Sequence, residues 1–362
     1  MLNFQPEQDI IASDADILVN TVNTVGVMGK GVARAFRSAF GEIMAPYEAA
    51  CAAERLAPGT FQVLPTEDGR HVVNLATKQD WRDPSRYEWV GSGLVYLNRH
   101  LRERDPRPVS VCMPTPGAGN GGLDAGRVQQ MVRTYLHETM REGIDVRLCA
   151  GREDPVDDPV FFAGVGSRKT PHAVLDLMRG IGSRLSEAGA HLRSGGAIGA
   201  DTAFFEGARE ANATGSEIFL AKPRKDLPEG IIPSSPVFDR MARNFHPRPA
   251  SITPDPNNQN DRRWTVFRLM SRNGNQVFGP DFTNPSCGLI CWTQEGKAGG
   301  GTGQAIRLAR SVGIPVLDLG RPDLAGVSAD DAADTAREMM REFRLSRGMP
   351  DPFPALSPDP TP

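Results

Sequence analysis

The sequence has few cysteines, few histidines and no long apolar run, and each shortage excludes a class of protein. Its five cysteines are odd in number and scattered, apart from Cys287 and Cys291 in the apolar run CGLICW. This pattern indicates reduced, packed thiols rather than a disulfide framework or a zinc site. The six histidines are dispersed as well, so we expect no bound metal.

Long hydrophobic segments and excess positive charge are missing too. No run approaches the roughly 20 apolar residues that span a bilayer, and the first residues, MLNFQPEQDI, lack a charged-then-apolar signal. We therefore expect a cytoplasmic protein without membrane contact. A formal net charge of -3 excludes a generally basic nucleic-acid coat, so any DNA contact should be confined to one site.

The composition is that of a soluble globular protein, with 39% hydrophobic and 23% charged residues over a length of 362. This length predicts two domains. We place the first at 1–152, before the acidic, proline-bearing stretch REDPVDDPV, and the second at 159–325. A proline- and asparagine-rich insertion at 224–284 should be a functional or partly disordered loop. Residues 326–362 should form a C-terminal helix and a mobile proline-rich tail.

Strand-like and helix-like segments alternate in both domains, which predicts two α/β folds. In the first domain the expected strands are 14–20, 61–65, 71–76, 109–114 and 146–150, and the expected helices are 31–40, 43–55, 87–104 and 126–143. In the second domain, glycine loops follow three strands of a parallel sheet. The expected strands there are 161–168, 190–197, 216–223, 287–293 and 314–320.

Two glycine-rich loops of the first domain follow strands and open helices. The first lies in NTVNTVGVMGKGVARAF (20–36) and the second in PTPGAGNGGLD (114–124). Such a loop presents backbone N–H groups to an anion, although one loop alone could be a tight turn that needs glycine only for its dihedral angles. Two loops at the carboxyl edge of one sheet can enclose a diphosphate from both sides.

Two charged residues stand beside these loops. Lys78, in NLATKQDW (74–81), directly follows an apolar strand, where partial desolvation would favour a neutral, nucleophilic amine; the alternative is a solvated loop lysine. Asp9, near the start of the sheet, could accept a hydrogen bond from the exocyclic amino group of a purine.

The three stretches NTVNTVGVMGKGVA, NLATKQDWRDPSRYEWV and GAGNGGLD resemble, in order and spacing, the DarG-type macrodomains, which remove ADP-ribose from DNA. The resemblance covers nearly all of 1–150. It implies a three-layer α/β/α fold, ADP-ribosylated DNA as substrate, a DarT-like ADP-ribosyltransferase as partner, and no cofactor other than ADP-ribose as ligand or product. It implies Lys78 and Asn23 as catalytic residues. The ligand-binding residues it implies are Asp9, Asn20, Gly26, Val27, Met28, Gly29, Lys30, Gly31, Val32, Thr77, Trp81, Gly117, Ala118, Gly119, Asn120, Gly121 and Gly122.

The resemblance further implies that Asp9 holds adenine and that Asn20 and Asn23 line the distal ribose. It also implies that the two glycine loops hold the diphosphate. Three positions depart from the family pattern. Ala118 replaces a cysteine of the usual loop, a small change that should preserve the loop. Asp80 stands where the family often has histidine, which puts the rate or the choice of target in doubt. Asp124, the nearest acid, lies just outside the second loop. Lys78 could attack the anomeric carbon or protonate the leaving base. A protein that only binds or senses ADP-ribose is the alternative function.

The second domain resembles the SLOG superfamily, the Rossmann-like group that includes DprA and the LOG hydrolases, in FAGVGSRKTP, LRSGGAIGADTAFFEGA and GGGTGQAIRLARSVGIPV. This resemblance implies a bound nucleotide-like ligand. Ala305 replaces the catalytic glutamate of the LOG enzymes, so we expect binding without hydrolysis; a purely structural domain is the alternative. Trp264, Arg243 and Arg248 of the insertion could contact single-stranded nucleic acid or simply pack. The implied ligand residues are Gly164, Gly166, Ser167, Arg168, Ser194, Gly195, Gly196, Asp201, Gly300, Gly301 and Thr302.

Overall fold

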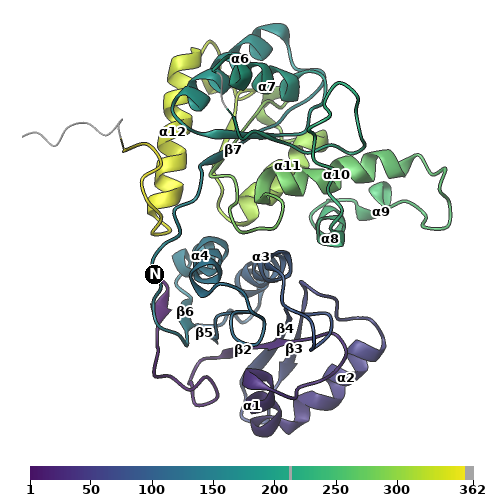
Figure 1. The fold of residues 1–362 in the computed structure, drawn as a ribbon, viewed down its shortest axis with the longest axis vertical. Coiled ribbons are helices and arrows are strands. Elements are labelled where there is room, and N and C mark those ends of the chain that lie inside the picture. Colours follow the sequence, from purple (N-terminus) through teal and green to yellow (C-terminus); the bar gives the residue numbers. More distant parts are fainter. Residues whose placement is uncertain (212–213, 355–362) are drawn as a thin grey trace, which may run out of the picture. The chain divides into compact units, whose positions relative to one another are not determined.

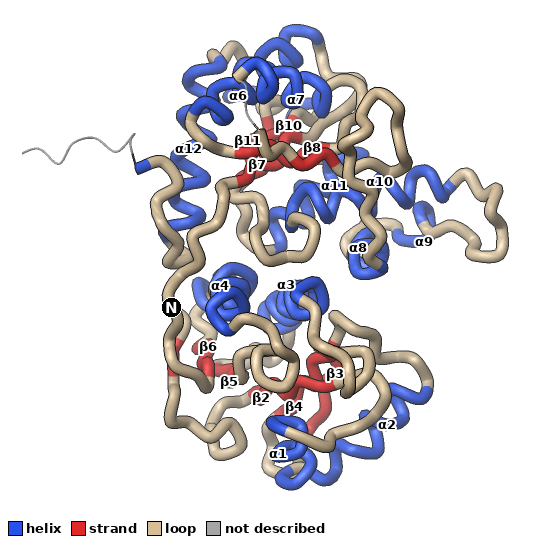
Figure 2. The backbone as a smooth tube through the Cα atoms, in the orientation of Figure 1, coloured by secondary structure: helices blue, strands red, loops and turns tan. Residues whose placement is uncertain are grey.

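The computed structural model describes the chain except residues 212–213 and 355–362, and it divides into two compact units (Figure 1). The first unit comprises Met1–Val156 with the short segment Asp281–Thr283, and the second comprises the remaining described residues. The end of the chain expected to be a mobile tail lies largely outside the described residues. Strands lie at the centre of each unit with helices around them (Figure 2).

The first unit has a six-stranded mixed sheet of order β1-β6-β5-β2-β4-β3. Only the β3–β4 pair is antiparallel. Helices cover both faces, α1 and α2 one of them, and α3 and α4 the other (Figure 1). This arrangement is the predicted three-layer α/β/α order. The strands are β1 (Asn3–Phe4), β2 (Ile17–Val22), β3 (Phe61–Pro65), β4 (His71–Ala76), β5 (Ser110–Met113) and β6 (Asp145–Leu148). The helices are α1 (Gly31–Ala39), η1 (Gly41–Ile43), α2 (Met44–Ala52), α3 (Tyr87–Glu103), α4 (Ala125–Tyr135) and α5 (His137–Arg141).

The register of the central strands brings the sequence motifs together. β2 is parallel to both β4 and β5, with Ile17 opposite His71 on one side and Val111 on the other. The carboxyl ends of these three neighbours therefore share one edge of the sheet. The loop after β2, the lysine after β4 and the second glycine loop after β5 all start at that edge.

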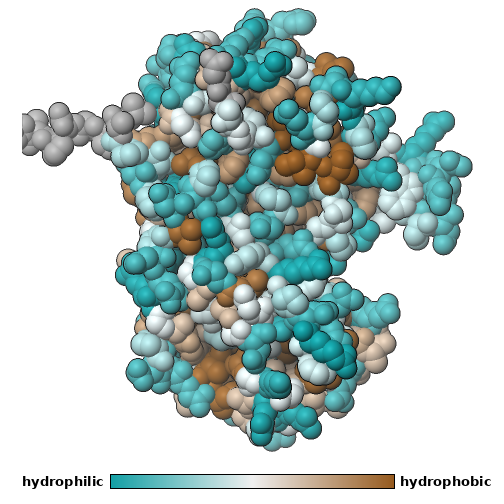
Figure 3. All heavy atoms as spheres, in the orientation of Figure 1, coloured by the Kyte–Doolittle hydropathy of each residue, from teal (hydrophilic) through white to brown (hydrophobic). Residues whose placement is uncertain are grey.

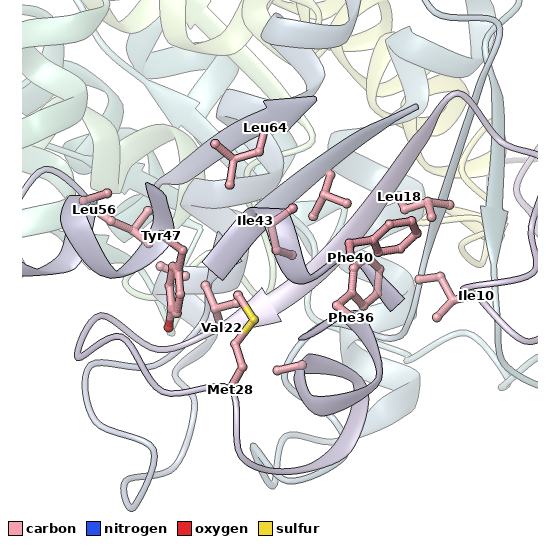
Figure 4. Close-up of a cluster of buried hydrophobic side chains, with 14 of the residues drawn as sticks. Ile10, Leu18, Val22, Met28, Phe36, Phe40, Ile43, Tyr47, Leu56 and Leu64 are labelled. Atoms are coloured by element: carbon pink, nitrogen blue, oxygen red, sulfur yellow. The ribbon is translucent and has the colours of Figure 1, made fainter. Parts of the chain in front are cut away.

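Apolar side chains of α1 and α2 fix these helices on the sheet (Figure 4). Phe36 of α1 and Phe40, which follows the helix directly, pack with Leu18 and Val22 of β2, and the ring centroids of Phe36 and Phe40 are 5.8 Å apart. Full burial of such a side chain stabilises a fold by roughly 1.5–3 kcal/mol. Because α1 begins directly after the first glycine loop, this packing also fixes the position of that loop.

The second unit has a five-stranded, fully parallel sheet of order β11-β10-β7-β8-β9. Helices α6 and α7 lie on one face, and α10 and α11 on the other (Figure 1). The strands are β7 (Phe161–Gly164), β8 (His191–Ser194), β9 (Glu217–Ile218), β10 (Gly288–Cys291) and β11 (Val316–Asp318). The helices outside the insertion are α6 (His172–Glu187), α7 (Ala200–Glu210), η2 (Gln294–Gly296), α11 (Gly300–Ser311), η3 (Pro322–Leu324) and α12 (Ala329–Leu345). The C-terminal helix α12 packs on α6 and β10.

The insertion contains three helices, so the prediction that it forms a loop is wrong. It contains α8 (Pro236–Asn244), α9 (Pro249–Ile252) and α10 (Arg263–Phe278). Two of its eight prolines, Pro236 and Pro249, occupy first-turn positions of α8 and α9, where an N–H would have no intrahelical partner, and the Ser235 side chain caps α8. Helix α10 buries Phe267 and Met270 in a small core with Ala242 and Ile252.

Within the described part of the chain, no helix is long and apolar enough to cross a bilayer. The face visible in Figure 3 is mostly hydrophilic, and its hydrophobic residues form small groups. All five cysteines are free thiols, and Cys287 and Cys291 are buried. No group of three or more potential metal ligands occurs among the residues that the structure describes.

Candidate functional site

A cavity of about 480 Å³ opens at the shared edge of β5, β2 and β4. Its volume is that of a small-molecule site, for which roughly 300–1,000 Å³ is usual. The two glycine loops and the segment after β4 form its walls, as the sequence predicts. The lining residues are Thr21, Val22, Asn23, Val27, Gly29, Lys30, Gly31, Val32, Ala33, Thr77, Lys78, Trp81, Arg82, Ser85, Pro114, Thr115, Gly117, Gly119, Asn120 and Gly121.

Asn23 organises the first glycine loop. Its side-chain oxygen accepts from the N–H groups of Val25 and Val27 at 3.1 and 3.2 Å, and its amide donates to the Val27 carbonyl at 2.6 Å. The buried Tyr47 hydroxyl donates to the Asn23 carbonyl at 2.9 Å. Asn23 lines the cavity, but its amide groups are engaged within the loop, so its catalytic role stays a prediction.

The second glycine loop needs glycine for space. A Cβ on Gly121 would lie 2.1 Å from the Gly117 carbonyl oxygen, and Gly117 itself has φ +77°. The loop closes with a hydrogen bond from Leu123 N–H to Gly117 at 3.1 Å, and the Ser85 N–H donates to Gly121 at 2.9 Å. The conformation is therefore tied to the segment that follows β4.

The two loops touch each other. A Cβ on Gly31, where φ is +58°, would lie 2.6 Å from the amide nitrogen of Asn120. Helix α1 begins at Gly31, and no side chain caps its first turn. Unpaired N–H groups at a helix N-terminus favour an anion. The contact of the two loops places these donors beside the second loop.

Lys78 lies between the loops. It is half-buried at the end of β4, and its Nζ donates to the carbonyl oxygen of Asn120 at 2.6 Å. On either side, Thr77 N–H bonds to the Val22 carbonyl and Thr24 N–H bonds to the Gln79 carbonyl, each at 3.0 Å. The lysine is thus held at the junction of β2, β4 and the second loop, with its amine at the cavity wall.

The charge of the lining is entirely positive. Lys30, Lys78 and Arg82 line the cavity, and within the described chain no acidic side chain does. Asp124 caps α4 instead, where its carboxylate accepts from the Arg127 N–H at 2.8 Å. Asp80 pairs with Arg82 at 3.3 Å. Such a site suits a ligand with at least two negative charges.

Six of the predicted ligand residues lie outside this lining. The Asn20 amide is fully buried and donates to Asn74 at 2.9 Å and to the Met28 sulfur at 3.6 Å. The Asp9 carboxylate accepts from Ile11 N–H at 3.0 Å within its own turn. The ligand contacts of this set therefore stay predictions. The set is Asp9, Asn20, Gly26, Met28, Ala118 and Gly122.

Sequence reasoning missed Ser85, Arg82, Thr21 and Thr115 of the lining. Ser85 is the most informative, because its hydroxyl is buried, lines the cavity and has no hydrogen-bond partner in the structure. A buried polar group without a partner costs about 1–3 kcal/mol, which a bound ligand oxygen would offset. Ser85 lies within the stretch NLATKQDWRDPSRYEWV, but nothing in that stretch distinguishes it from its neighbours, since it meets the second glycine loop only through tertiary packing.

Outside the cavity, Cys112 of β5 and Cys149 form a close thiol pair, with sulfur atoms 3.0 Å apart. The hydrogen bond from Cys149 lowers the pKa of Cys112 to about 7, in spite of burial. The same interaction, with burial, raises the pKa of Cys149. The pair therefore holds one proton firmly and the other weakly.

The second unit has its own cavity, of about 570 Å³, at the carboxyl ends of β7, β8 and β10. Nine predicted residues line it, whereas Gly164 and Ser194 lie inside strands, where the Ser194 hydroxyl donates to the Gly164 carbonyl at 2.7 Å. The nine residues are Gly166, Ser167, Arg168, Gly195, Gly196, Asp201, Gly300, Gly301 and Thr302.

Asp201 and Arg272 form a buried pair in this second cavity. The carboxylate accepts from Ala197 N–H at 3.2 Å and lies 3.4 Å from the guanidinium of Arg272. Burial raises the pKa of Asp201, an effect that Arg272 opposes. The sequence did not predict Arg272, Asn273 or Gln276 as lining residues, because they belong to helix α10 of the insertion.

Other insertion residues have packing roles. The Trp264 ring lies edge-on to Phe267 with centroids 6.2 Å apart, and its N–H donates to the Asn258 carbonyl at 3.0 Å. The Arg243 guanidinium lies 4.9 Å from the centre of the Phe267 ring. These contacts favour packing over nucleic-acid binding for Trp264 and Arg243.

The comparison with protein families agrees with the mixed sheet between two helical layers that the first unit shows. Residues 19–132 match the Macro domain family. The first unit therefore has the macrodomain fold.

Among curated proteins, relatives share this region. A Mycobacterium tuberculosis "DNA ADP-ribosyl glycohydrolase" is 42% identical over 125 residues, 34% of this chain and 35% of that protein. A Thermus aquaticus protein of the same name is 36% identical over 183 residues, 49% of this chain and 50% of that protein. A Thermosipho africanus "DNA ADP-ribosyl transferase-DNA ADP-ribosyl glycohydrolase fusion protein" is 28% identical over 148 residues, 36% of this chain and 38% of that protein. The chain thus spans half or less of the length of these relatives.

Proposed function

We propose that the first unit hydrolyses the N-glycosidic bond between ADP-ribose and a nucleobase in DNA. The observation that carries this proposal is the position of Lys78, whose amine lies at the wall of the cavity and donates to Asn120 between the two glycine loops. A protein that only binds ADP-ribose needs the loops but no reactive group at that position. The names of the curated relatives support the same activity.

The size of the cavity and the positive charge of its lining support a diphosphate-bearing ligand such as ADP-ribose. Donors come from the first turn of α1 and from the second loop, and Lys30, Lys78 and Arg82 supply positive charge. Charge-assisted hydrogen bonds to phosphate are about twice as strong as neutral ones. With the diphosphate held by the loops, the distal ribose and its anomeric carbon would extend toward Lys78.

Lys78 has two chemically balanced roles. As a nucleophile, the neutral amine forms a bond to the anomeric carbon, and the bond from that carbon to the base breaks. The base nitrogen keeps the electron pair and takes a proton. Water then releases ADP-ribose and restores the amine. As an acid, the ammonium protonates the base while water attacks the carbon. Only the first route leaves an adduct on Lys78, which borohydride reduction and mass spectrometry would detect.

The test is release of ADP-ribose from an oligonucleotide ADP-ribosylated on thymidine, with an ADP-ribosylated protein as the comparison substrate. We expect release from the DNA. Tight binding of ADP-ribose without release from either substrate would favour the alternative function of a binder or sensor.

We further propose that a DNA ADP-ribosyltransferase supplies this substrate. The supporting observation is the Thermosipho africanus relative, whose name joins the two activities in one chain. Co-expression with an active transferase tests the pairing: the protein should lower the amount of ADP-ribosylated DNA in the cell.

For the second unit we propose a SLOG-like domain that binds a nucleotide-like, phosphate-bearing ligand without cleaving it. The supporting observation is Arg272, which is only 7% exposed, lines the cavity and has no partner for its Nε. Ala305 also lines the cavity, where it offers no acid for hydrolysis. A thermal-shift screen of nucleotides with the whole protein tests the proposal. A ligand at about 100 times its Kd should add roughly 2.7 kcal/mol of stability.

A further inference from the structure

Trp81 is an exposed aromatic residue at the wall of the first cavity. Its relative exposure is 45%, and among the described residues it is the only aromatic side chain with large hydrophobic surface left exposed. It lies three residues after Lys78 and lines the same cavity. Single exposed apolar residues are common, but one at the wall of a substrate cavity indicates contact with a partner or substrate. On the opposite loop, Val27 is 40% exposed and also lines the cavity.

Arg82 adds positive charge to this aromatic surface. Its guanidinium lies 4.5 Å from the centre of the Trp81 ring, and its side chain is 67% exposed. Its ion pair with Asp80 is 3.3 Å long and solvent-exposed, so it constrains Arg82 weakly. Tryptophan with an adjacent arginine is suited to a nucleotide, because the ring stacks on a base while the guanidinium pairs with a phosphate.

The segment that carries Trp81 is anchored on both sides. The Gln79 carbonyl accepts from the N–H and the hydroxyl of Thr24 at 3.0 and 3.1 Å, which fixes the segment to the first glycine loop. The N–H of Ser85 bonds to the Gly121 carbonyl of the second loop at 2.9 Å. A nucleotide stacked on Trp81 would therefore keep a fixed position relative to Lys78.

We propose that Trp81 and Arg82 bind the unpaired nucleotide next to the modified one in the DNA substrate. This inference rests on the proposed function of the first unit. The modified base is bonded to the anomeric carbon beside Lys78, so the DNA strand leaves the cavity on the side of the lysine segment. There the neighbouring base stacks on the indole, and the intervening phosphate pairs with Arg82. Stacking on a side chain requires an unpaired base, so the substrate is single-stranded at this point.

The kinetic test compares an ADP-ribosylated oligonucleotide with the corresponding ADP-ribosylated single nucleoside. Loss of a base–aromatic stack weakens binding by about 5- to 160-fold, the equivalent of roughly 1–3 kcal/mol. We therefore expect Trp81→Ala to raise KM for the oligonucleotide at least fivefold more than for the nucleoside. Trp81→Phe should restore most of the loss, and Arg82→Ala should weaken the dependence of KM on salt. The control is Val109→Ala, at a 72% exposed residue outside the cavity lining. It should leave KM unchanged for both substrates.

A binding measurement keeps the inference separate from catalysis. In the Lys78→Ala background, fluorescence anisotropy gives the affinity for the ADP-ribosylated oligonucleotide, and competition gives that for free ADP-ribose. The additional substitution Trp81→Ala should weaken binding of the oligonucleotide more than binding of ADP-ribose. Equal losses for both ligands would mean that Trp81 contacts ADP-ribose itself, and no loss for either would overturn the inference as well. Absence of turnover in the unmodified protein would contradict the proposed hydrolase, while this binding result would still decide the role of Trp81.

Discussion

The substitution Gly29→Glu tests whether the first glycine loop holds a diphosphate. Gly29 lines the cavity, and the nearest atom to a Cβ built there is Val27 Cγ1 at 3.6 Å, an ordinary contact. Its φ is outside the left-handed region. A side chain at this position should therefore leave the fold intact and act mainly on the ligand.

The expected loss follows from Coulomb's law. A carboxylate about 6 Å from a diphosphate with two negative charges repels it by roughly 1.4 kcal/mol in bulk water and by roughly 5.5 kcal/mol at an effective dielectric constant of 20. The carboxylate would also pair with the cations Lys30 and Lys78 that the ligand uses. We expect the affinity for ADP-ribose to fall at least tenfold, since 1.4 kcal/mol corresponds to a factor of ten.

Calorimetric titration of ADP-ribose provides the assay, with two controls. Gly29→Gln has the same size without the charge, and Gly29→Ala adds only the Cβ. The contribution of charge to the lost affinity is the difference in binding free energy between Gly29→Glu and Gly29→Gln. This difference should shrink when the ionic strength rises, because salt screens exposed charges. If folded Gly29→Glu protein binds ADP-ribose with unchanged affinity, the loop is merely a strand-to-helix turn and the diphosphate assignment is wrong.

Three further predictions concern ligand binding and stability. Removal of the unpartnered hydroxyl by Ser85→Ala should weaken ADP-ribose binding by about 0.5–1.5 kcal/mol without lowering Tm, which calorimetry and thermal melts would show; a loss of Tm with unchanged affinity would refute a ligand contact. Burial, with the charge of Arg104, lowers the pKa of His71 and His100 below the ordinary 6.5. Protonation thus favours the unfolded chain, so stability should be full above about pH 6.5 and decrease as pH falls through the folded-state pKa; the double variant His71→Gln/His100→Gln should flatten this slope in melts from pH 7.5 to 5. Met340→Ala, at a buried residue of α12 that packs over Gly288, should cost roughly 2–5 kcal/mol in urea unfolding of the second unit, whereas Leu345→Ala at a 50% exposed position should cost little.

In the first unit the sequence was sufficient for most of the elements, whereas the helices of the insertion were not predicted. Short apolar runs mark β2, β4 and β5, and the glycine loops mark where two of these strands end. Parallel strands of one sheet end at the same edge, so a meeting of the two loops could be expected, while the adjacency of β5, β2 and β4 that brings Lys78 to them is known only from the structure.

Residues that join the site from another part of the chain could not be predicted. Ser85 has no local signature, because it reaches the cavity wall through tertiary packing beside Gly117 and Gly121. Arg272 was missed for a related reason: its helix lies in a segment whose prolines and asparagines are typical of loops. A pattern in sequence shows which residues are near one another along an element, and these two side chains meet their partners through tertiary packing.

Asn20 shows that a motif can also mark a residue that the structure places outside the cavity lining. Its place in the NTVN motif predicts a ribose contact, but the position lies within β2 and points its amide to Asn74 of β4. Asn23, three residues later, has left the strand and lies at the cavity, with its amide engaged by the loop. The motif therefore identifies the loop. Whether an asparagine of the motif lines the cavity depends on its position, within β2 for Asn20 and after the strand for Asn23.

The most direct test of the proposed hydrolase is Lys78→Ala, assayed on an oligonucleotide ADP-ribosylated on thymidine. The released ADP-ribose is quantified in single-turnover reactions, and binding of free ADP-ribose is titrated on the same preparation. Lys78→Arg, which keeps the positive charge but is neither a nucleophile nor an acid at neutral pH, is the matched control. The proposal predicts no release by either variant, with ADP-ribose affinity within about tenfold of the unmodified protein, or roughly 1.4 kcal/mol. Release by Lys78→Ala at the rate of the unmodified protein would contradict it.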